Sequence, residues 1–325
     1  MLGYVIRRLA ALPPILIAVS IAVFALTRLM PGNIAQLMLG PNATQQQIAE
    51  LEHEYGLDKP VFELRPPFGQ YGEWIADLAR GDLGRSFLRD RAVGDEIASR
   101  LPITGQLLIM TIIVTAVLGV GMGMLAAANH RRPLDHLLRS VNILGMSVPT
   151  FWVATLVILI PSLLWSYAPP FGHVSFFENP VDNLRQYGPP ALVLGFASAC
   201  GLARIVRGSI LGVLGQDFMR TARAKGLSEG VVLRRHALGN VMLPIVTILG
   251  IEAATLMGGT VIIEQVFNLN GLGRLLLDSV TMRDYPVIQV MALYTAIVFV
   301  VLFLIIDLTY ASLDPRVRLT GGRVA

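Results

Sequence analysis

Six long apolar stretches limit what this chain can fold into. They span 9–26, 103–128, 141–167, 190–206, 241–263 and 287–310. Each is close to the roughly 20 residues that an α-helix needs to cross about 30 Å of hydrocarbon. Hydrophobic residues make up 54% of the chain and charged residues 15%, whereas a soluble domain has about 25% charged residues. The sequence therefore predicts an all-α membrane protein with six transmembrane helices.

The cations of the loops predict the orientation of these helices. Lysine and arginine are enriched in short loops on the cytoplasmic side of a membrane. With a cytoplasmic amino terminus, six spans place all the strongly basic segments on that side, namely Arg7, Arg8, Arg131, Arg132, Arg139, the stretch 217–240, Arg316, Arg318 and Arg323. Both termini are therefore expected in the cytoplasm.

The spans divide the chain into four predicted segments. These are an N-terminal transmembrane helix (1–30), an extracytoplasmic helical segment (31–102), a core of five transmembrane helices with a cytoplasmic loop at 217–240 (103–312), and a cytoplasmic tail (313–325). In the extracytoplasmic segment, Thr44 is a suitable helix cap, and apolar residues follow at helical spacing after it and again over 71–78. Two short amphipathic helices are expected. They either pack on the ends of the spans or dock an extracytoplasmic partner.

The stretch "RTARAKGLSEGVVLRRHALGN", residues 220–240, is rich in cations and lies between two apolar spans. Asp217 is expected to cap a short helix through Lys225, Gly226 to end it in a left-handed conformation, and Ser228 to cap a second helix that reaches Leu238. Small and basic side chains on the first helix let a partner protein approach closely. Three alternatives are binding of anionic lipid, the inter-span loop of a secondary transporter, and a DNA-reading hairpin, which confinement between two spans disfavours.

The wider stretch "DFMRTARAKGLSEGVVLRRHALGNVMLP" resembles the signature loop of ABC importer permeases of the peptide/nickel type. Four further stretches, which follow one another along nearly the whole chain, resemble the same family: "MLGYVIRRLAALPPILIAVSIAVFALTRLMPGN", "GDLGRSF", "VFNLNGLGRLLLDSVTMRDYPVIQ" and "DLTYASLDPRVR". Two departures are visible. The Glu-Ala-Ala of sugar and amino-acid importers is replaced by Arg220, Thr221 and Ala222, and Gly239 stands where the family has a basic residue.

The resemblance implies that the loop docks on a separate ATPase subunit. The implied docking residues are Arg220, Thr221, Ala222, Arg223, Ala224, Lys225, Gly226 and Leu227. The implied partners are a second, distinct permease chain, two ATP-binding subunits, an extracytoplasmic substrate-binding protein and membrane lipid, with no nucleic acid. The implied location is the bacterial inner membrane. Di- and oligopeptides are the expected cargo, and nickel chelates, opines and glutathione stay open.

The chain lacks the motifs of an enzyme. A phosphate-binding loop needs a lysine followed by serine or threonine, but Lys59 precedes Pro60 and Lys225 precedes Gly226. Neither H-E-x-x-H nor G-x-S-x-G occurs. We therefore expect no catalytic residue, no metal site and no cofactor in this chain, and ATP with Mg²⁺ on the partner subunits.

Glu252 is the candidate residue for the translocation pathway, because an ionisable group deep in a span is costly unless it has a function. A carboxylate satisfied by a neighbouring helix is the alternative, and a structural role is expected for Glu264, which lies nearer a span end. The glycines of the second and fifth spans are expected to allow close helix packing. Cys200 is expected to be a buried packing residue, and Pro149 and Pro161 are expected to kink the third span.

A proton-coupled secondary transporter using Glu252 is the second functional interpretation, and a membrane scaffold or channel is the third. The absence of visible inverted repeats weakens the secondary-transporter reading.

Overall fold

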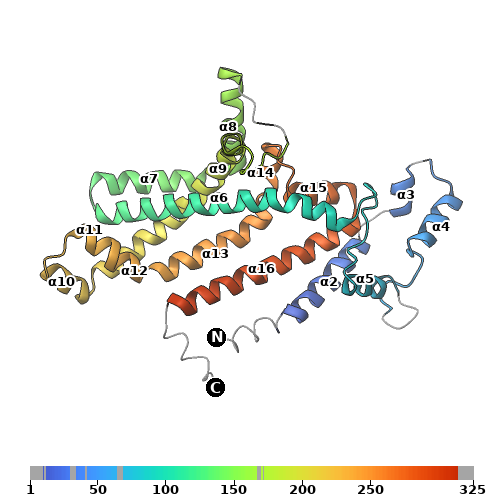
Figure 1. Ribbon diagram of the computed structural model, residues 1–325, viewed down its shortest axis with the longest axis horizontal. Coiled ribbons are helices and arrows are strands. Elements are labelled where there is room, and N and C mark those ends of the chain that lie inside the picture. Colours follow the sequence, from blue (N-terminus) through green and yellow to red (C-terminus); the bar gives the residue numbers. More distant parts are fainter. Residues whose placement is uncertain are drawn as a thin grey trace. The chain divides into compact units, whose positions relative to one another are not determined.

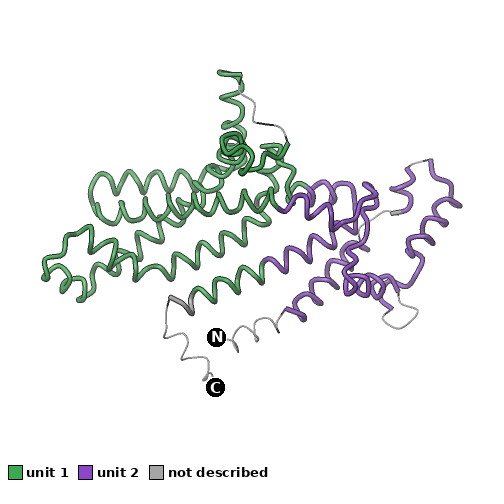
Figure 2. The backbone as a smooth tube through the Cα atoms, in the orientation of Figure 1, with its two compact units in different colours: residues 1–5, 102–274, 299–325 green, residues 6–101, 275–298 purple. Residues whose placement is uncertain are grey.

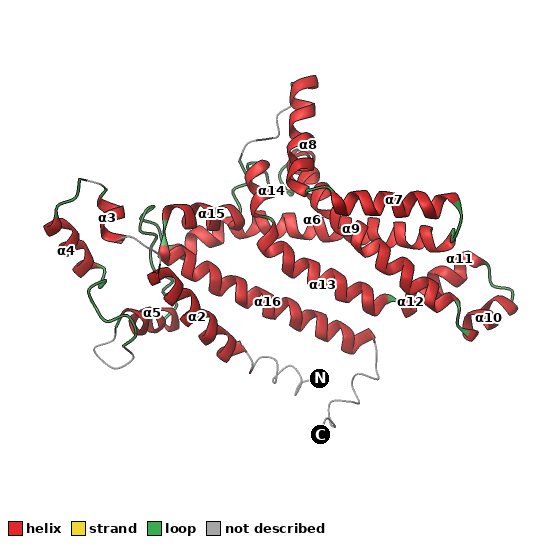
Figure 3. Ribbon diagram, turned by 180° about the vertical axis from the view of Figure 1, so that it is seen from behind, coloured by secondary structure: helices red, strands yellow, loops and turns green. Residues whose placement is uncertain are grey.

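The computed structural model describes residues 10, 12–29, 34–40, 42–63, 69–166, 170 and 172–313, and helices dominate throughout (Figure 1). These residues contain no β-strand (Figure 3), and their one extended pairing is an isolated antiparallel bridge between Arg85 and Ala92. The predicted all-α class is confirmed. The basic residues Arg7 and Arg8 and those of the predicted tail lie outside the described residues.

The chain divides into two compact units (Figure 2). Unit 1 comprises Met1–Val5, Pro102–Arg274 and Phe299–Ala325, and unit 2 comprises Ile6–Leu101 and Leu275–Val298. These units follow contacts in space, so they do not coincide with the four segments predicted along the chain.

Unit 1 contains most of the helices. They are α6 (Val93–Ala128) from Pro102 onward, α7 (Pro133–Ser147), α8 (Thr150–Trp165), α9 (Pro180–Leu214), the short elements of 217–240, α13 (Met242–Gly259), α14 (Val261–Val266) and the end of α16 (Tyr285–Leu313). Unit 2 contains α2 (Leu12–Leu29), α3 (Ile34–Leu39), α4 (Gln45–Glu54), α5 (Gln70–Ala79), the start of α6, most of α15 (Leu272–Met282) and the first part of α16.

Four described helices are long and apolar enough to cross a membrane, namely α2, α6, α9 and α16. Two further crossings exist if each of two bent helix pairs counts as one span. The first pair, α7 and α8, replaces the single third span that the sequence predicts, and its helices meet at 94°. Pro149 causes the break because it has no amide hydrogen and holds Val148 in an extended conformation, with φ −86° and ψ 127°. Pro161 remains inside α8.

Helix α9 is the centre of unit 1. Of its most apolar window 56% is buried, against 17–28% for α2, α6 and α16. Glycines let its neighbours approach: a Cβ on Gly119 or Gly123 of α6 would lie within 3 Å of Leu202 or Val206 of α9. Close packing is thus confirmed at these two glycines.

The predicted close packing is confirmed at some of the other glycines and wrong at others. A Cβ on Gly250 of α13 would clash with Ile306 of α16, which confirms close packing there, but a Cβ on Gly121 or Gly258 would meet nothing within 4 Å, so the prediction is wrong for these two. Cys200 is fully buried in α9, as predicted for a packing residue.

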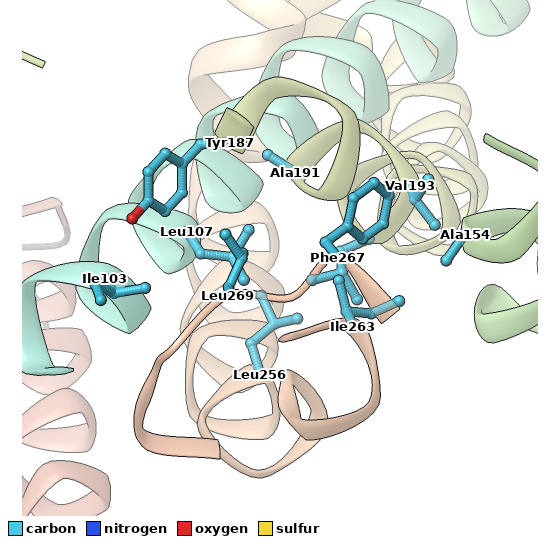
Figure 4. Packing of buried hydrophobic residues seen from close by; sticks show 11 residues of the cluster. Ile103, Leu107, Ala154, Tyr187, Ala191, Val193, Leu256, Ile263, Phe267 and Leu269 are labelled. Atoms are coloured by element: carbon cyan, nitrogen blue, oxygen red, sulfur yellow. The ribbon is translucent and has the colours of Figure 1, made fainter. Parts of the chain in front are cut away.

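One apolar core of unit 1 is closed by the segment that follows α14. In Figure 4 the side chains of Phe267 and Leu269 project toward Leu107 of α6 and the helix that carries Tyr187. Ile263 and Leu256 complete this side of the core. The Tyr187 hydroxyl, itself buried in the core, forms a hydrogen bond of 2.8 Å with Nδ1 of His173.

A fully buried carboxylate holds this closing segment in place. Glu264 accepts hydrogen bonds from the Thr104 hydroxyl (2.7 Å) and from the backbone amide of Arg274 (2.9 Å). The Thr104 hydroxyl in turn accepts from the amide of Leu272 at 2.8 Å. Gly271 is required beside them, because a Cβ there would lie 2.5 Å from the carboxylate. Glu264 therefore has the structural role expected for it.

In unit 2, both amphipathic helices predicted from the sequence are present as α4 and α5. Thr44 caps α4 through a reciprocal capping box with Gln47. The rings of Phe24, Tyr71 and Trp74 pack together, with centroids 5.3–6.1 Å apart. The aromatic cluster attaches α5 to α2, and the hydroxyls of Ser20 and Tyr71 lie 2.9 Å apart beside it.

Replacing Thr104 by valine tests the buried network around Glu264. The substitution keeps the side-chain shape but leaves a carboxylate oxygen and the Leu272 amide without their partner, so we expect a loss of about 1–3 kcal/mol in unfolding free energy. Thermal unfolding of the detergent-solubilised protein measures it. Thr255→Val is the matched control, because its exposed hydroxyl bonds only to the carbonyl of Ile251 in its own helix. Equal loss in both variants would contradict the role of the network.

Candidate functional site

The cationic segment 217–240 forms two helical arms joined by a turn, and we call it the hairpin. Its first arm is α10 (Asp217–Ala224). Gln216 occupies the cap position, so the predicted cap at Asp217 is wrong by one residue, although an acidic residue in the first turn still complements the helix dipole. The helix ends as predicted. Gly226 has φ +78°, and its amide donates to the carbonyl of Arg223 at 2.9 Å.

The second arm is less regular than predicted. It consists of α11 (Glu229–Val231), the π-helical segment η1 (Val232–Ala237) and α12 (Leu238–Asn240). Ser228 takes the cap position without a side-chain hydrogen bond, so its predicted capping is wrong in this respect. A π segment is a costly departure from α geometry and occurs often at functional sites. The arm then meets α13 at a bend of 60°.

A second apolar core fixes the hairpin to the long helices of unit 1. Met219 and Ala222 of α10 are buried together with Val206 and Ile210 of α9, and with Ala127 at the end of α6. Val232, Ala237, Val241 and Ile245 continue this core into the second arm and α13. The hairpin therefore shares one apolar core with the ends of α6 and α9 and the start of α13.

The structure exposes seven of the eight predicted docking residues. Ala222 is the exception, since it is only 7% exposed and belongs to the core beneath the surface. The exposed residues are Arg220, Thr221, Arg223, Ala224, Lys225, Gly226 and Leu227. These residues lie on α10 and the turn that follows it, and α10 is found at one end of unit 1 (Figures 1 and 2).

Ion pairs order part of this surface. Arg223 joins the two arms through Nε, which lies 2.7 Å from a carboxylate oxygen of Glu229, and Arg220 lies 3.6 Å from Asp217. Lys225 has no acidic partner within 4.0 Å among the residues that the structure describes. Lys225 is therefore the cation of the first arm most available to an acidic group on another protein.

Sequence reasoning missed two exposed apolar side chains on the hairpin. Phe218 is 41% exposed and Val231 is 40% exposed, beside the predicted Leu227 at 38%. Large apolar residues within a charged loop were the sequence signal that could have predicted these exposed side chains. Together the three provide apolar contact area next to the cations, which is the composition of a protein-binding surface.

Glu252 lies apart from the hairpin, within α13. It is half-buried, and one of its carboxylate oxygens accepts a hydrogen bond of 3.0 Å from the hydroxyl of Ser198 in α9. About ten residues of helix, roughly 15 Å, separate it from the start of α13. No group of three or more potential metal ligands exists among the described residues.

The fold defined by these helices is that of an ABC importer permease. The chain superposes on an inward-facing MetNI methionine ABC transporter with a TM-score of 0.53 at 15% identity, covering 67% of this chain and 96% of that one. It also superposes on an amino acid ABC transporter crystallised with histidines, with a TM-score of 0.52 at 16% identity, covering 67% of this chain and 94% of that one.

Sequence comparison gives the family. The profile of the binding-protein-dependent transport system inner membrane component matches residues 119–319, and the profile of the N-terminal part of such membrane components matches residues 1–108. The glutathione transport system permease protein GsiC of Escherichia coli K12 is 40% identical over 318 residues, covering 98% of this chain and 99% of that protein. GsiC of Shigella flexneri is 39% identical over the same length and coverage.

The chain belongs to the family of binding-protein-dependent transport system inner membrane components. It is a multi-pass bacterial inner-membrane protein, the permease subunit of an ABC importer, and a transport component rather than an enzyme. The expected resemblance to peptide/nickel-type permeases is thereby confirmed, and the readings as a secondary transporter, scaffold or channel are replaced.

Replacing Met219 by alanine tests how the hairpin is anchored. Met219 is fully buried, so the cavity and lost contacts are expected to cost ~2–5 kcal/mol locally. Trypsin should then cleave faster after Arg220, Arg223 and Lys225, as mass spectrometry of timed digests would report. Phe218→Ala, at the exposed neighbouring position, should leave the cleavage rate near that of the native protein. A native rate for Met219→Ala would show that α10 does not depend on this core.

Proposed function

We propose that this permease imports small peptides, glutathione among them, and that the hairpin 217–240 couples it to a separate ATPase. The observation that carries the coupling role is the joint placement of the hairpin residues. Met219 and Ala222 anchor the hairpin in the core, and the small and basic residues beside them are exposed, so a partner can reach them. The cargo is inferred from the GsiC relatives, whose names specify glutathione transport.

In this proposal the chain forms half of the translocation pore, and a second, distinct permease chain forms the other half. Two ATP-binding subunits hydrolyse ATP with Mg²⁺, a substrate-binding protein delivers cargo from outside, and lipid surrounds the spans. The chain itself binds no cofactor. ATP-driven closure of the ATPase dimer moves α10, and the shared core passes this movement to α9 and α13.

Gly226→Asp tests the docking role. The substitution introduces a charge and a side chain at the turn of the hairpin, at φ +78°, where a partner must approach closely. We expect the chain to insert in the membrane but to lose its ATPase subunits on purification in mild detergent, together with ATP-driven uptake.

Gly81→Asp is the matched control for this experiment. Gly81 also has a positive φ, +85°, and open space around an added Cβ, so the backbone strain and the charge are alike, but it lies between α5 and α6. Its ATPase content should equal that of the native complex. Native ATPase content and uptake in Gly226→Asp would refute docking through this turn.

Glu252 is proposed to line the translocation pathway. Its single described hydrogen bond, from Ser198, leaves carboxylate acceptor capacity unused in an apolar helix. Glu252→Gln should lower uptake about tenfold, the equivalent of one charged hydrogen bond at ~1.4 kcal/mol, with no loss of bound ATPase.

Initial rates of labelled-glutathione uptake into proteoliposomes, with and without a protonophore, provide the readout. Glu178→Gln, the same change at an exposed position before α9, should have no effect. Uptake that requires the proton gradient rather than ATP would overturn the importer mechanism, and unchanged uptake in Glu252→Gln would remove Glu252 from the pathway.

A further inference from the structure

An ion pair with a buried carboxylate joins the first turn of α7 to α9. The Asp135 carboxylate is 1% exposed and accepts from Nε and Nη2 of Arg207, at 2.7 and 2.8 Å, and from the backbone amide of Arg131 at 3.0 Å. Nδ1 of His130 lies 3.5 Å from the carboxylate and 3.2 Å from Arg207. We call Asp135 and Arg207 the clamp.

The clamp is more than a consequence of positive loop charge. Arg132 and Arg139, in the same basic region, have exposed side chains, whereas the Arg207 side chain is only 18% exposed and binds one carboxylate with two nitrogens. Burying a charge pair is favourable only with this kind of bidentate geometry and further hydrogen bonds. Arg131, whose amide supplies one of them, adopts φ +64°, which is costly for a residue other than glycine.

The clamp lies beside the core that anchors the docking hairpin. Arg207 directly follows Val206 and precedes Ile210 by one helical turn, and both of these residues belong to the same core as Met219 of α10. On the other side, Ala127, a member of the same core, precedes His130 at the end of α6. The clamp residues are therefore neighbours in sequence of the core residues that anchor the hairpin.

Beyond the clamp, close packing also holds α6 and α7 against α9. Gly119 and Gly123 bring α6 into direct contact with Leu202 and Val206 of α9, and a Cβ on Gly145 of α7 would lie 2.5 Å from Sγ of Cys200 in α9. Interfaces this close do not slide without a clash, because protein interiors are packed as densely as crystals.

We propose that the Asp135–Arg207 clamp makes α6, α7 and α9 one rigid lever, so that movement of the docking hairpin reaches α6 and α7 as well as α9. The inference rests on the proposed coupling function. The two clamp residues are positioning residues: they contact neither cargo nor ATPase, and they act by holding the helices that the hairpin moves.

The test measures the coupling ratio, cargo imported per ATP hydrolysed, of the complete complex in proteoliposomes. Arg207→Gln and Asp135→Asn each leave one buried charge unpaired and are expected to impair folding as well. The double variant Asp135→Asn with Arg207→Gln removes both charges, so no charge is left unpaired, and it is expected to fold better than either single variant. Arg204→Gln, on the exposed side of α9, is the control.

The double variant is expected to assemble with native ATPase content and to hydrolyse ATP, but to import about fivefold less cargo per ATP, the lower limit of a typical coupling between sites. A clamp that only stabilises the fold would change thermal stability and leave this ratio unchanged, which overturns the inference. A wild-type complex without ATP-driven import would overturn the proposed function, and the inference with it.

A distance measurement on native helices provides a second, independent test. Spin labels are attached through His136→Cys in α7 and Gly208→Cys in α9, both at exposed positions, and the fully buried Cys200 is kept because it packs against Gly145. The inference requires the same label separation in the nucleotide-free and ATP-trapped complexes. A separation that changes between the two states would show that α7 and α9 move independently and would overturn the inference even where the double variant fails to assemble.

Discussion

The absence of water in the bilayer interior is the constraint on which the rest of this structure depends. Every backbone polar group there must find a partner within the protein. Helices satisfy the backbone, and buried carboxylates nearer the ends of the spans have specific partners: Glu264 binds Thr104 and the Arg274 amide, and Asp135 binds Arg207 and the Arg131 amide. The Glu264–Thr104 and Asp135–Arg207 contacts join residues 160 and 72 positions apart in the sequence, so buried polar groups also select how the helices pack.

Much of the fold could be predicted because transmembrane helices are recognisable from local composition. The apolar runs gave the positions of α2, α6, α9, α13 and α16, although α9 begins ten residues before its apolar run and ends eight after it. The 94° break at Pro149 could not be predicted as more than a kink, because the angle depends on what α7 and α8 pack against. For the same reason composition did not separate Gly119, which contacts α9, from Gly121, which faces open space.

In the candidate site, too, the features set by local sequence could be predicted, and those set by packing between helices could not. The hairpin and the left-handed Gly226 follow from local chemistry, and the docking residues follow from the family resemblance. Ala222 is buried because its place on α10 faces the core, which a one-dimensional motif does not reveal. The clamp escaped sequence reasoning altogether, since Asp135 and Arg207 are 72 residues apart and each resembles an ordinary charge near a span end.

The π-helical segment Val232–Ala237 has a consequence for how such permeases diverge. A π turn holds one residue more than an α turn. Deleting one residue there would restore a regular helix, and everything before it would rotate about the axis by roughly 100° relative to everything after it. One deletion could thus present a different face of α10 while α13 keeps its register in the membrane. If the hairpin docks as proposed, the extra residue is a place where a permease lineage could change its ATPase specificity without rebuilding its spans.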